Sequence, residues 1–125
     1  MEYTYRASLN DMPTTIFLAE YNLTVKKGKQ EMVIPYAMVN DVVLDKNKKL
    51  FKTELHIDTH SKLTITNTYH ASSKDVEDRS RAYSTFVRVL HFHLKDKSKA
   101  RFAVLRIFGF SKQYSPTEIP LEFLP

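Results

Sequence analysis

Residues 14–44 read TTIFLAEYNLTVKKGKQEMVIPYAMVNDVVL, and this stretch decides the fold. Apolar and polar residues alternate on both sides of the loop KKGK (26–29), which predicts two strands joined as a hairpin. Gly28 is one of only two glycines in the chain, which indicates that the backbone needs unusual freedom in this loop. The β-branched and aromatic residues of 14–19 predict a strand before the hairpin, and VNDVVLD (39–45) predicts a strand after it.

Further strands are expected on either side of this stretch. MEYTYRAS (1–8) has the composition of an N-terminal strand. Downstream, FKTELHID (51–58) and KLTITNTYH (62–70) each place apolar residues at alternate positions, so they predict a second hairpin. The connecting turn would place Ile57 opposite Leu63, so that inner residues meet inner residues, and the other face should be wet.

Beyond residue 74 the apolar period changes from that of a strand to that of a helix. The apolar stripe consists of Val76, Tyr83, Val87, Leu90 and Leu94. A serine at 72 or 73 could cap the start, acidic residues crowd the first turn, and lysines lie at the far end, so a helix is predicted over 74–96. Because 85–94 is also rich in strand formers, a hairpin of 85–94 with 101–110 is the alternative. Residues 101–110 form a strand in either case, and the proline-containing tail 115–125 should run extended along the surface.

Composition limits the class of protein. The chain has 125 residues, enough for one domain, and 42% are hydrophobic, enough for one core. It has no cysteine, which fits an intracellular, cytoplasmic protein. No apolar run approaches the roughly 18 residues of a membrane span, and the N-terminus is too polar for a signal peptide. The formal net charge of +5 suggests an anionic partner, although ordinary solubilising charge is the simpler explanation.

The stretch 14–44 contains Tyr21-Asn22-Leu23, the charged loop Lys26–Gln30 and Ile34-Pro35-Tyr36, with Val39, Val42 and Val43 at the apolar positions that follow. On these residues it resembles the bacterial pleckstrin-homology-like and GRAM families, and the resemblance extends roughly over 14–96. The resemblance implies a mainly β, α+β fold, in which a partly open antiparallel barrel is capped by one amphipathic helix. Within a single domain, 1–96 would be the core, and 97–125 would add an extra C-terminal strand and an extended tail.

Domains that look like this mostly bind phosphoinositides, proteins or peptides. The resemblance therefore implies a non-enzymatic binding module for a protein or peptide, working near an anionic membrane surface, with no cofactor. In its sharper version, the anionic surface is bound by Lys26, Lys27, Lys29, Lys46, Lys48 and Lys49. The family's Lys…Arg-x-Arg phosphate pattern is missing, because no arginine lies between Arg6 and Arg79. Exposed strand edges could also mediate self-association into a homo-oligomer.

Nucleic-acid binding through residues 79–102 is the alternative function, because basic residues alternate there with aromatic ones. Tyr83, Phe86 and Phe92 could offer stacking faces. Against this, Tyr83 belongs to the apolar stripe of the helix and Phe86 borders it, which leaves only Phe92 outside. An exposed Phe92 would more naturally mark a protein contact, or a seat for the C-terminal strand.

Metal binding and catalysis find little support in the sequence. His56, Asp58 and His60 would share a face of a strand, but His60 falls in the predicted turn and the spacing matches no known ligand set. Glu54 and Asp58 could pair as carboxylates, although a wet strand face explains them equally well. No nucleophile elbow and no glycine-rich phosphate loop occurs. We therefore expect neither a metal site nor an enzyme.

Overall fold

The computed structural model describes residues 1–58, 61–106 and 111–125, so His60 and Gly109 lie outside the described residues. Its strands are β1 (Glu2–Tyr5), β2 (Thr14–Leu18), β3 (Asn22–Lys27), β4 (Gln30–Pro35), β5 (Val39–Asn47), β6 (Leu50–Ile57), β7 (Ser61–Thr66), β8 (Thr68–Ser72), β9 (Asp75–Asp78), β10 (Arg101–Leu105) and β11 (Ser111–Gln113). The helix α1 spans Ser80–Lys97, and two short 3-10 turns are η1 (Tyr36–Met38) and η3 (Leu121–Phe123).

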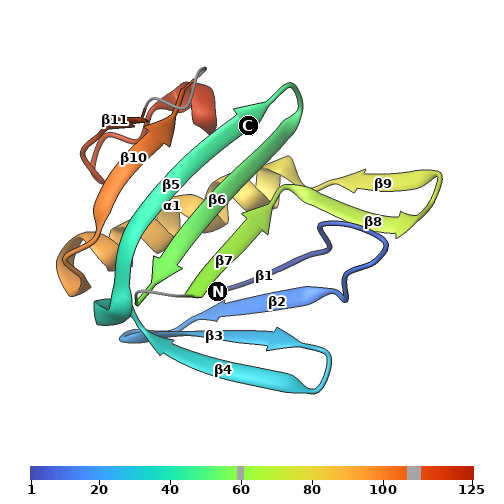
Figure 1. Ribbon diagram of the computed structural model, residues 1–125, viewed down its shortest axis with the longest axis horizontal. Helices are drawn as coiled ribbons and strands as arrows, with labels where there is room; N and C mark the ends of the chain where they lie inside the picture. Colours follow the sequence, from blue (N-terminus) through green and yellow to red (C-terminus); the bar gives the residue numbers. More distant parts are fainter. Residues whose placement is uncertain (59–60, 107–110) are drawn as a thin grey trace.

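The strands form two large sheets and one small ribbon. The first sheet has the antiparallel order β1-β2-β3-β4, and the second has the order β11-β10-β5-β6-β7. Strands β8 and β9 form a two-stranded ribbon that projects from the body of the molecule, and α1 lies across the space between the large sheets (Figure 1). Among the described strands, no ladder joins the two large sheets, so the barrel is open. The predicted α+β fold, a pleckstrin-homology-like open barrel with one helix, is confirmed.

Tyrosine side chains bridge the two sheets where a backbone ladder is missing. The phenol of Tyr3 donates to the carbonyl of Thr66 at 2.5 Å, and that of Tyr5 donates to the carbonyl of Thr64 at 2.8 Å. Thr66, expected on the wet face, is consequently buried. At the end of β1, the backbone of Arg6 exchanges hydrogen bonds with the ribbon through Thr68 and His70.

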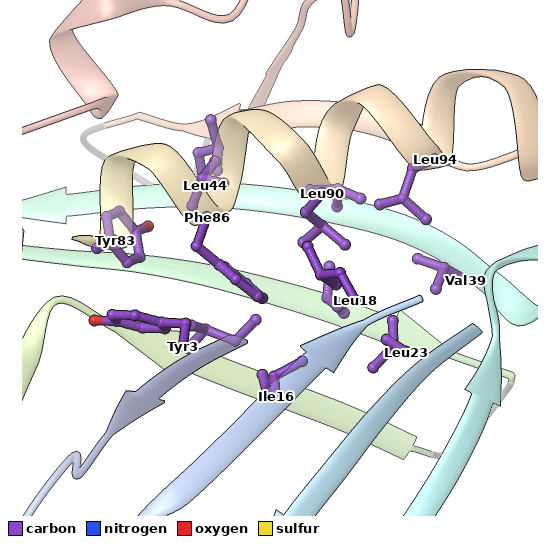
Figure 2. Packing of buried hydrophobic residues seen from close by; sticks show 14 of the residues in the cluster. Tyr3, Ile16, Leu18, Leu23, Val39, Leu44, Tyr83, Phe86, Leu90 and Leu94 are labelled. Carbon is purple, nitrogen blue, oxygen red and sulfur yellow. The ribbon is translucent and has the colours of Figure 1, made fainter. Parts of the chain in front are cut away.

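The core lies between the sheets and beneath α1. Figure 2 shows side chains of the helix pointing toward those of the first sheet, with the second sheet behind them. The labelled core residues are Tyr3, Ile16, Leu18, Leu23, Val39, Leu44, Tyr83, Phe86, Leu90 and Leu94. Burying a side chain of this size contributes about 1.5–3 kcal/mol, so the helix stripe is a main source of stability. The helical assignment of 85–94 is thereby confirmed over the strand alternative.

The helix begins later than predicted, at Ser80 instead of residue 74. Residues 75–78 form β9, in which Glu77 pairs with Tyr69 of β8, and Val76 is half exposed, outside the helix stripe. Asp78 still serves the helix start, because its carboxylate accepts a hydrogen bond from the Ser80 N–H at 2.9 Å. An acidic cluster before an apolar stripe is thus compatible with a strand that ends just before the helix.

The hairpin of β6 and β7 has the predicted inner face but a register shifted by two residues. Ile57 lies opposite Ser61, and Leu55 lies opposite Leu63. The predicted second strand is also interrupted at Asn67. The Asn67 side chain accepts from the Phe51 N–H at 2.9 Å and donates to the Lys49 carbonyl at 3.0 Å. These bonds satisfy a buried amide and turn the chain from β7 into β8.

The C-terminal segment adds the expected extra strand. Strand β10 pairs in parallel with β5, and Phe102 and Val104 are buried. The predicted strand 101–110 is therefore confirmed over Arg101–Leu105, and residues 107–110 lie outside the described residues. The tail is not entirely on the surface, because Phe123 joins the core.

Candidate functional site

The six lysines predicted to bind an anionic surface fall into two separate groups. Lys26 and Lys27 end β3, and Lys29 lies in the loop to β4. Lys46 lies near the end of β5, and the other two form the turn between β5 and β6. The tips of these two hairpins lie on opposite sides of the molecule (Figure 1). The fold therefore does not gather the six lysines into one site.

The first group surrounds the loop that Gly28 makes possible. Gly28 has a φ of +61°, and the Met12 side chain packs where a Cβ would stand, with Cε at 2.7 Å from that position. Lys26 lies over the Phe17 ring, with Nζ 5.0 Å from the ring centroid, and Lys27 approaches Asp11 at 3.7 Å. Such exposed contacts are weak and leave the lysines available to a partner.

The second group lies beside a cleft of mixed charge. Lys46 and Lys48 line an open cleft of about 980 Å³ together with Arg106, and the carboxylates of Asp45 and Glu122 line the same cleft. Because acidic and basic groups both line it, the cleft is not a uniformly positive site. Lys48 itself has a φ of 57°, as the two-residue turn requires.

Strand β4 forms the outer edge of the first sheet, and it pairs with β3 alone among the described strands. Its burial pattern is unusual, since Ile34 is buried whereas Met32 and Val33 are 54% and 57% exposed. Met32 alternates with Ile34 and so shares its face of the strand, but it is exposed because the barrel core ends before the hairpin tip.

Backbone geometry shows which groups of β4 face outward. The Tyr36 N–H donates to the Tyr21 carbonyl at 3.1 Å, and the strand pairing continues this alignment to Lys27 opposite Gln30. Even-numbered residues of this stretch therefore bond to β3, and the odd-numbered ones, which include Glu31 and Val33, direct N–H and C=O groups away from the sheet. Pro35 falls at an outward position, where its missing N–H costs the ladder nothing.

Residues 79–102 do not form a continuous basic surface with stacking rings. Arg79 is engaged by the Glu77 carboxylate at 2.8 Å and by the Thr4 carbonyl at 2.9 Å. Arg101 makes a two-pronged contact with Asp41 at 2.9 and 3.2 Å. Tyr83 and Phe86 are fully buried, and Phe92 is 62% exposed. Two of the three predicted stacking faces are thus lost to the core.

The histidines that the structure describes do not form a metal site, and His91 has a structural role. In the described part of the chain, no three His, Cys, Asp or Glu residues gather where they could hold a metal ion. His56 Nε2 lies 3.5 Å from the Glu54 carboxylate, which also approaches the Lys62 ammonium at 3.7 Å. Burial lowers the pKa of His91 to about 4, and its ring joins the helix to Tyr114, with Nε2 and the phenol oxygen 2.6 Å apart. The C-terminal segment is therefore seated on His91, and Phe92 does not contribute.

His93 forms a second contact at the end of α1. Its ring stacks on Tyr36, with centroids 5.0 Å apart, and its Nδ1 lies 3.0 Å from the Lys97 ammonium. Lys97 also donates to the Glu20 carbonyl at 2.5 Å. Burial, and secondarily Lys97, lowers the pKa of His93.

No helix within residues 1–58, 61–106 and 111–125 is both long and apolar enough to cross a membrane.

Comparison with known proteins supports the fold but does not identify a family. No family model matches the chain, and no curated protein matches it. A chain in the structure of the Spt16D Pob3N heterodimer is similar in fold, with a TM-score of 0.53 at 9% sequence identity. The match covers 88% of this chain and 57% of that chain, so this chain spans little more than half the length of its structural neighbour. The likeness supports a pleckstrin-homology-like fold, and membership of a bacterial GRAM-like family stays an expectation.

Proposed function

We propose that this chain is a protein-binding module, and that it takes up an extended segment of a partner protein as an added strand on β4. The observation that carries the proposal is the outer edge of β4, where Glu31 and Val33 direct backbone donors and acceptors away from the sheet. Strand addition uses such an edge, because main-chain hydrogen bonds supply affinity and alternate side chains supply specificity.

The exposed side chains of β4 support the same conclusion. Sheet edges are commonly protected by charges, prolines or a covering loop, because an open edge invites pairing. Strand β4 has Glu31 and, at its end, Pro35, but Met32 and Val33 lie between them and are more than half exposed. Covering two such side chains would add apolar burial to the new backbone bonds. The similar solved structure is a heterodimer, which agrees with a protein partner in general terms.

A proline pair along β4 tests the proposal. Val33→Pro deletes an outward N–H and should leave the ladder to β3 intact, whereas Met32→Pro deletes an inward N–H and should destabilise the fold by about 3 kcal/mol. Linear peptides selected on the wild-type protein from a displayed random library should bind the folded Val33→Pro variant about tenfold more weakly, because one bond is lost and the ring obstructs the edge. Val33→Thr, which keeps the N–H, is the matched control and should retain most of the binding. Selected peptides that bind Val33→Pro as well as wild type, or a selection that yields no binder, would count against the β4 edge.

Attraction to an anionic membrane is a second candidate, because Lys26, Lys27 and Lys29 are all exposed at the tip of a projecting hairpin. Lysines near an anionic surface contribute about 1 kcal/mol each. Lys46, Lys48 and Lys49 lie at the tip of the other hairpin, between β5 and β6, away from these three (Figure 1). Co-sedimentation with anionic and neutral liposomes tests this candidate. Binding at physiological salt that is lost when the three hairpin lysines become alanine supports it, and a wild-type protein left in the supernatant excludes it.

A further inference from the structure

We infer that the partner strand runs antiparallel to β4 and carries an apolar residue opposite Val33, a basic residue two positions later and an acidic residue four positions later. This inference rests on the proposed function and specifies the chemistry of the occupant. In an antiparallel pair, the partner's sequence runs from Val33 toward Lys29 as β4 is read backward. The partner's residues therefore meet Val33 and Glu31 along the strand and then pass Lys29, the loop residue just before β4.

The apolar requirement comes from the outer face of the first sheet. Val33 lies opposite Thr24, and Thr24 lies opposite Phe17, so these three form one row across the sheet. Val33 ends the row and is 57% exposed. A β-branched or aromatic residue beside it would extend the row by one strand, which is the arrangement that stabilises sheets. The next residue of the partner lies on the other face, beside the exposed Met32, and should also be apolar.

The charge requirements come from Glu31 and Lys29. Glu31 lies opposite Lys26 on one side, and its other side faces the open edge, so a basic partner residue would complete a row of alternating charge. Lys29 is exposed and makes no ion pair among the described residues. An acidic residue beside it would be attracted, and an acidic residue beside Glu31 would be repelled.

Antiparallel pairing is favoured for two reasons. Antiparallel ladders are slightly more stable per residue, and β4 already belongs to an antiparallel sheet. A second copy of this chain is the rival occupant. Two β4 strands paired antiparallel about Met32 would set Glu31 of one against Val33 of the other, and Lys29 against Pro35, so in that register neither charge would gain a partner.

Three peptides of one composition test the inference. All contain the same polar flanks around the cores Ile-Val-Lys-Thr-Glu (matched), Ile-Val-Glu-Thr-Lys (charges exchanged) or Glu-Thr-Lys-Val-Ile (reversed). Binding is measured by titration while backbone amide shifts of β4 are followed by NMR. The matched peptide should bind about tenfold more tightly than the charge-exchanged one, because two attractions become two repulsions. The difference should shrink in high salt. In a Glu31→Lys, Lys29→Glu protein, the preference should invert.

The outcomes separate the inference from the proposed function. If all three peptides shift the amides of Glu31 and Val33 with equal affinity, the inference is wrong and strand addition on β4 stands. If the reversed peptide binds best, the partner runs parallel, and the inference is again wrong. If none of the three peptides shifts the β4 amides even at the highest peptide concentration tested, both the inference and the proposed function fail. A dimer of the free protein that Val33→Pro dissociates would identify a second copy as the occupant.

Discussion

His91 shows how one buried side chain can hold two parts of the chain together. It is 1% exposed, and its Nδ1 lies 2.8 Å from the Val87 carbonyl. A carbonyl only accepts, so Nδ1 carries the proton, and Nε2 accepts from the Tyr114 phenol. Burial raises the pKa of that phenol, so it keeps its proton. With His91 neutral, the pair thus fixes the C-terminal segment to the helix.

Acid should therefore weaken the fold through His91. Its folded pKa of about 4 lies below the ordinary value of 6.5, so the unfolded chain takes up a proton first. Stability should be fully present above about pH 6.5 and should fall as the pH falls toward 4, by at most about 3 kcal/mol. Urea unfolding at several pH values measures this loss. His93 shifts in the same direction, so His91→Leu is the control: its stability should depend less on pH, and an unchanged slope would contradict the role of His91.

Replacing Gly28 should lower the stability of the fold mainly because of its left-handed backbone, and less because of contact with Met12. Gly28→Ala would place a Cβ on a residue with φ of +61°, and the Met12 side chain that it meets is flexible. We expect a loss of about 1–2 kcal/mol in unfolding free energy. Met12→Ala in the same chain removes the steric part and should recover little of the loss. Full recovery would show that contact with Met12, and not the left-handed backbone, makes the glycine necessary.

At the scale of elements, two phenylalanines separated by ten positions should behave oppositely. Phe102 of β10 is 7% exposed and Phe92 of α1 is 62% exposed. Phe102→Ala should cost about 3–5 kcal/mol, and Phe92→Ala should stay within about 0.5 kcal/mol. Chemical unfolding measured by circular dichroism compares them. If Phe102→Ala were as stable as wild type, β10 would not belong to the same cooperative core as the rest of the domain.

Element boundaries mark where prediction from the sequence reached its limit. The helix stripe from Tyr83 to Leu94 was predictable, because its period is set by burial against the sheets. The helix start was not, because the acidic residues of Asp75–Asp78 satisfy helix-dipole preferences, and yet this segment pairs with β8 across a short turn. The register of β6 and β7 was missed by two residues for a similar reason. Inner faces match in either register, and only the actual turn length decides between them.

At the scale of the whole molecule, the strands and the helix follow from the periods of the apolar residues, and the open barrel follows from the resemblance of 14–96 to pleckstrin-homology-like domains. The spatial relation between distant loops does not. Lys26 and Lys48 both lie in charged hairpins, and only the fold reveals that the tips of these hairpins lie apart (Figure 1). The edge status of β4 was equally hidden, because a strand pattern does not say which neighbours the strand acquires. The functional proposal therefore depends on topology and could not come from composition.

Hydrogen exchange along β4 tests the central claim most directly. In the free protein, the amides of Met32 and Ile34 should exchange slowly, and those of Glu31 and Val33 should exchange fast, because only the former bond to β3. Saturation with the matched peptide should slow the Glu31 and Val33 amides and leave the alternate pair unchanged. The account would be contradicted if all four amides were already protected in the free protein. It would also be contradicted if bound peptide left Glu31 and Val33 exchanging as before.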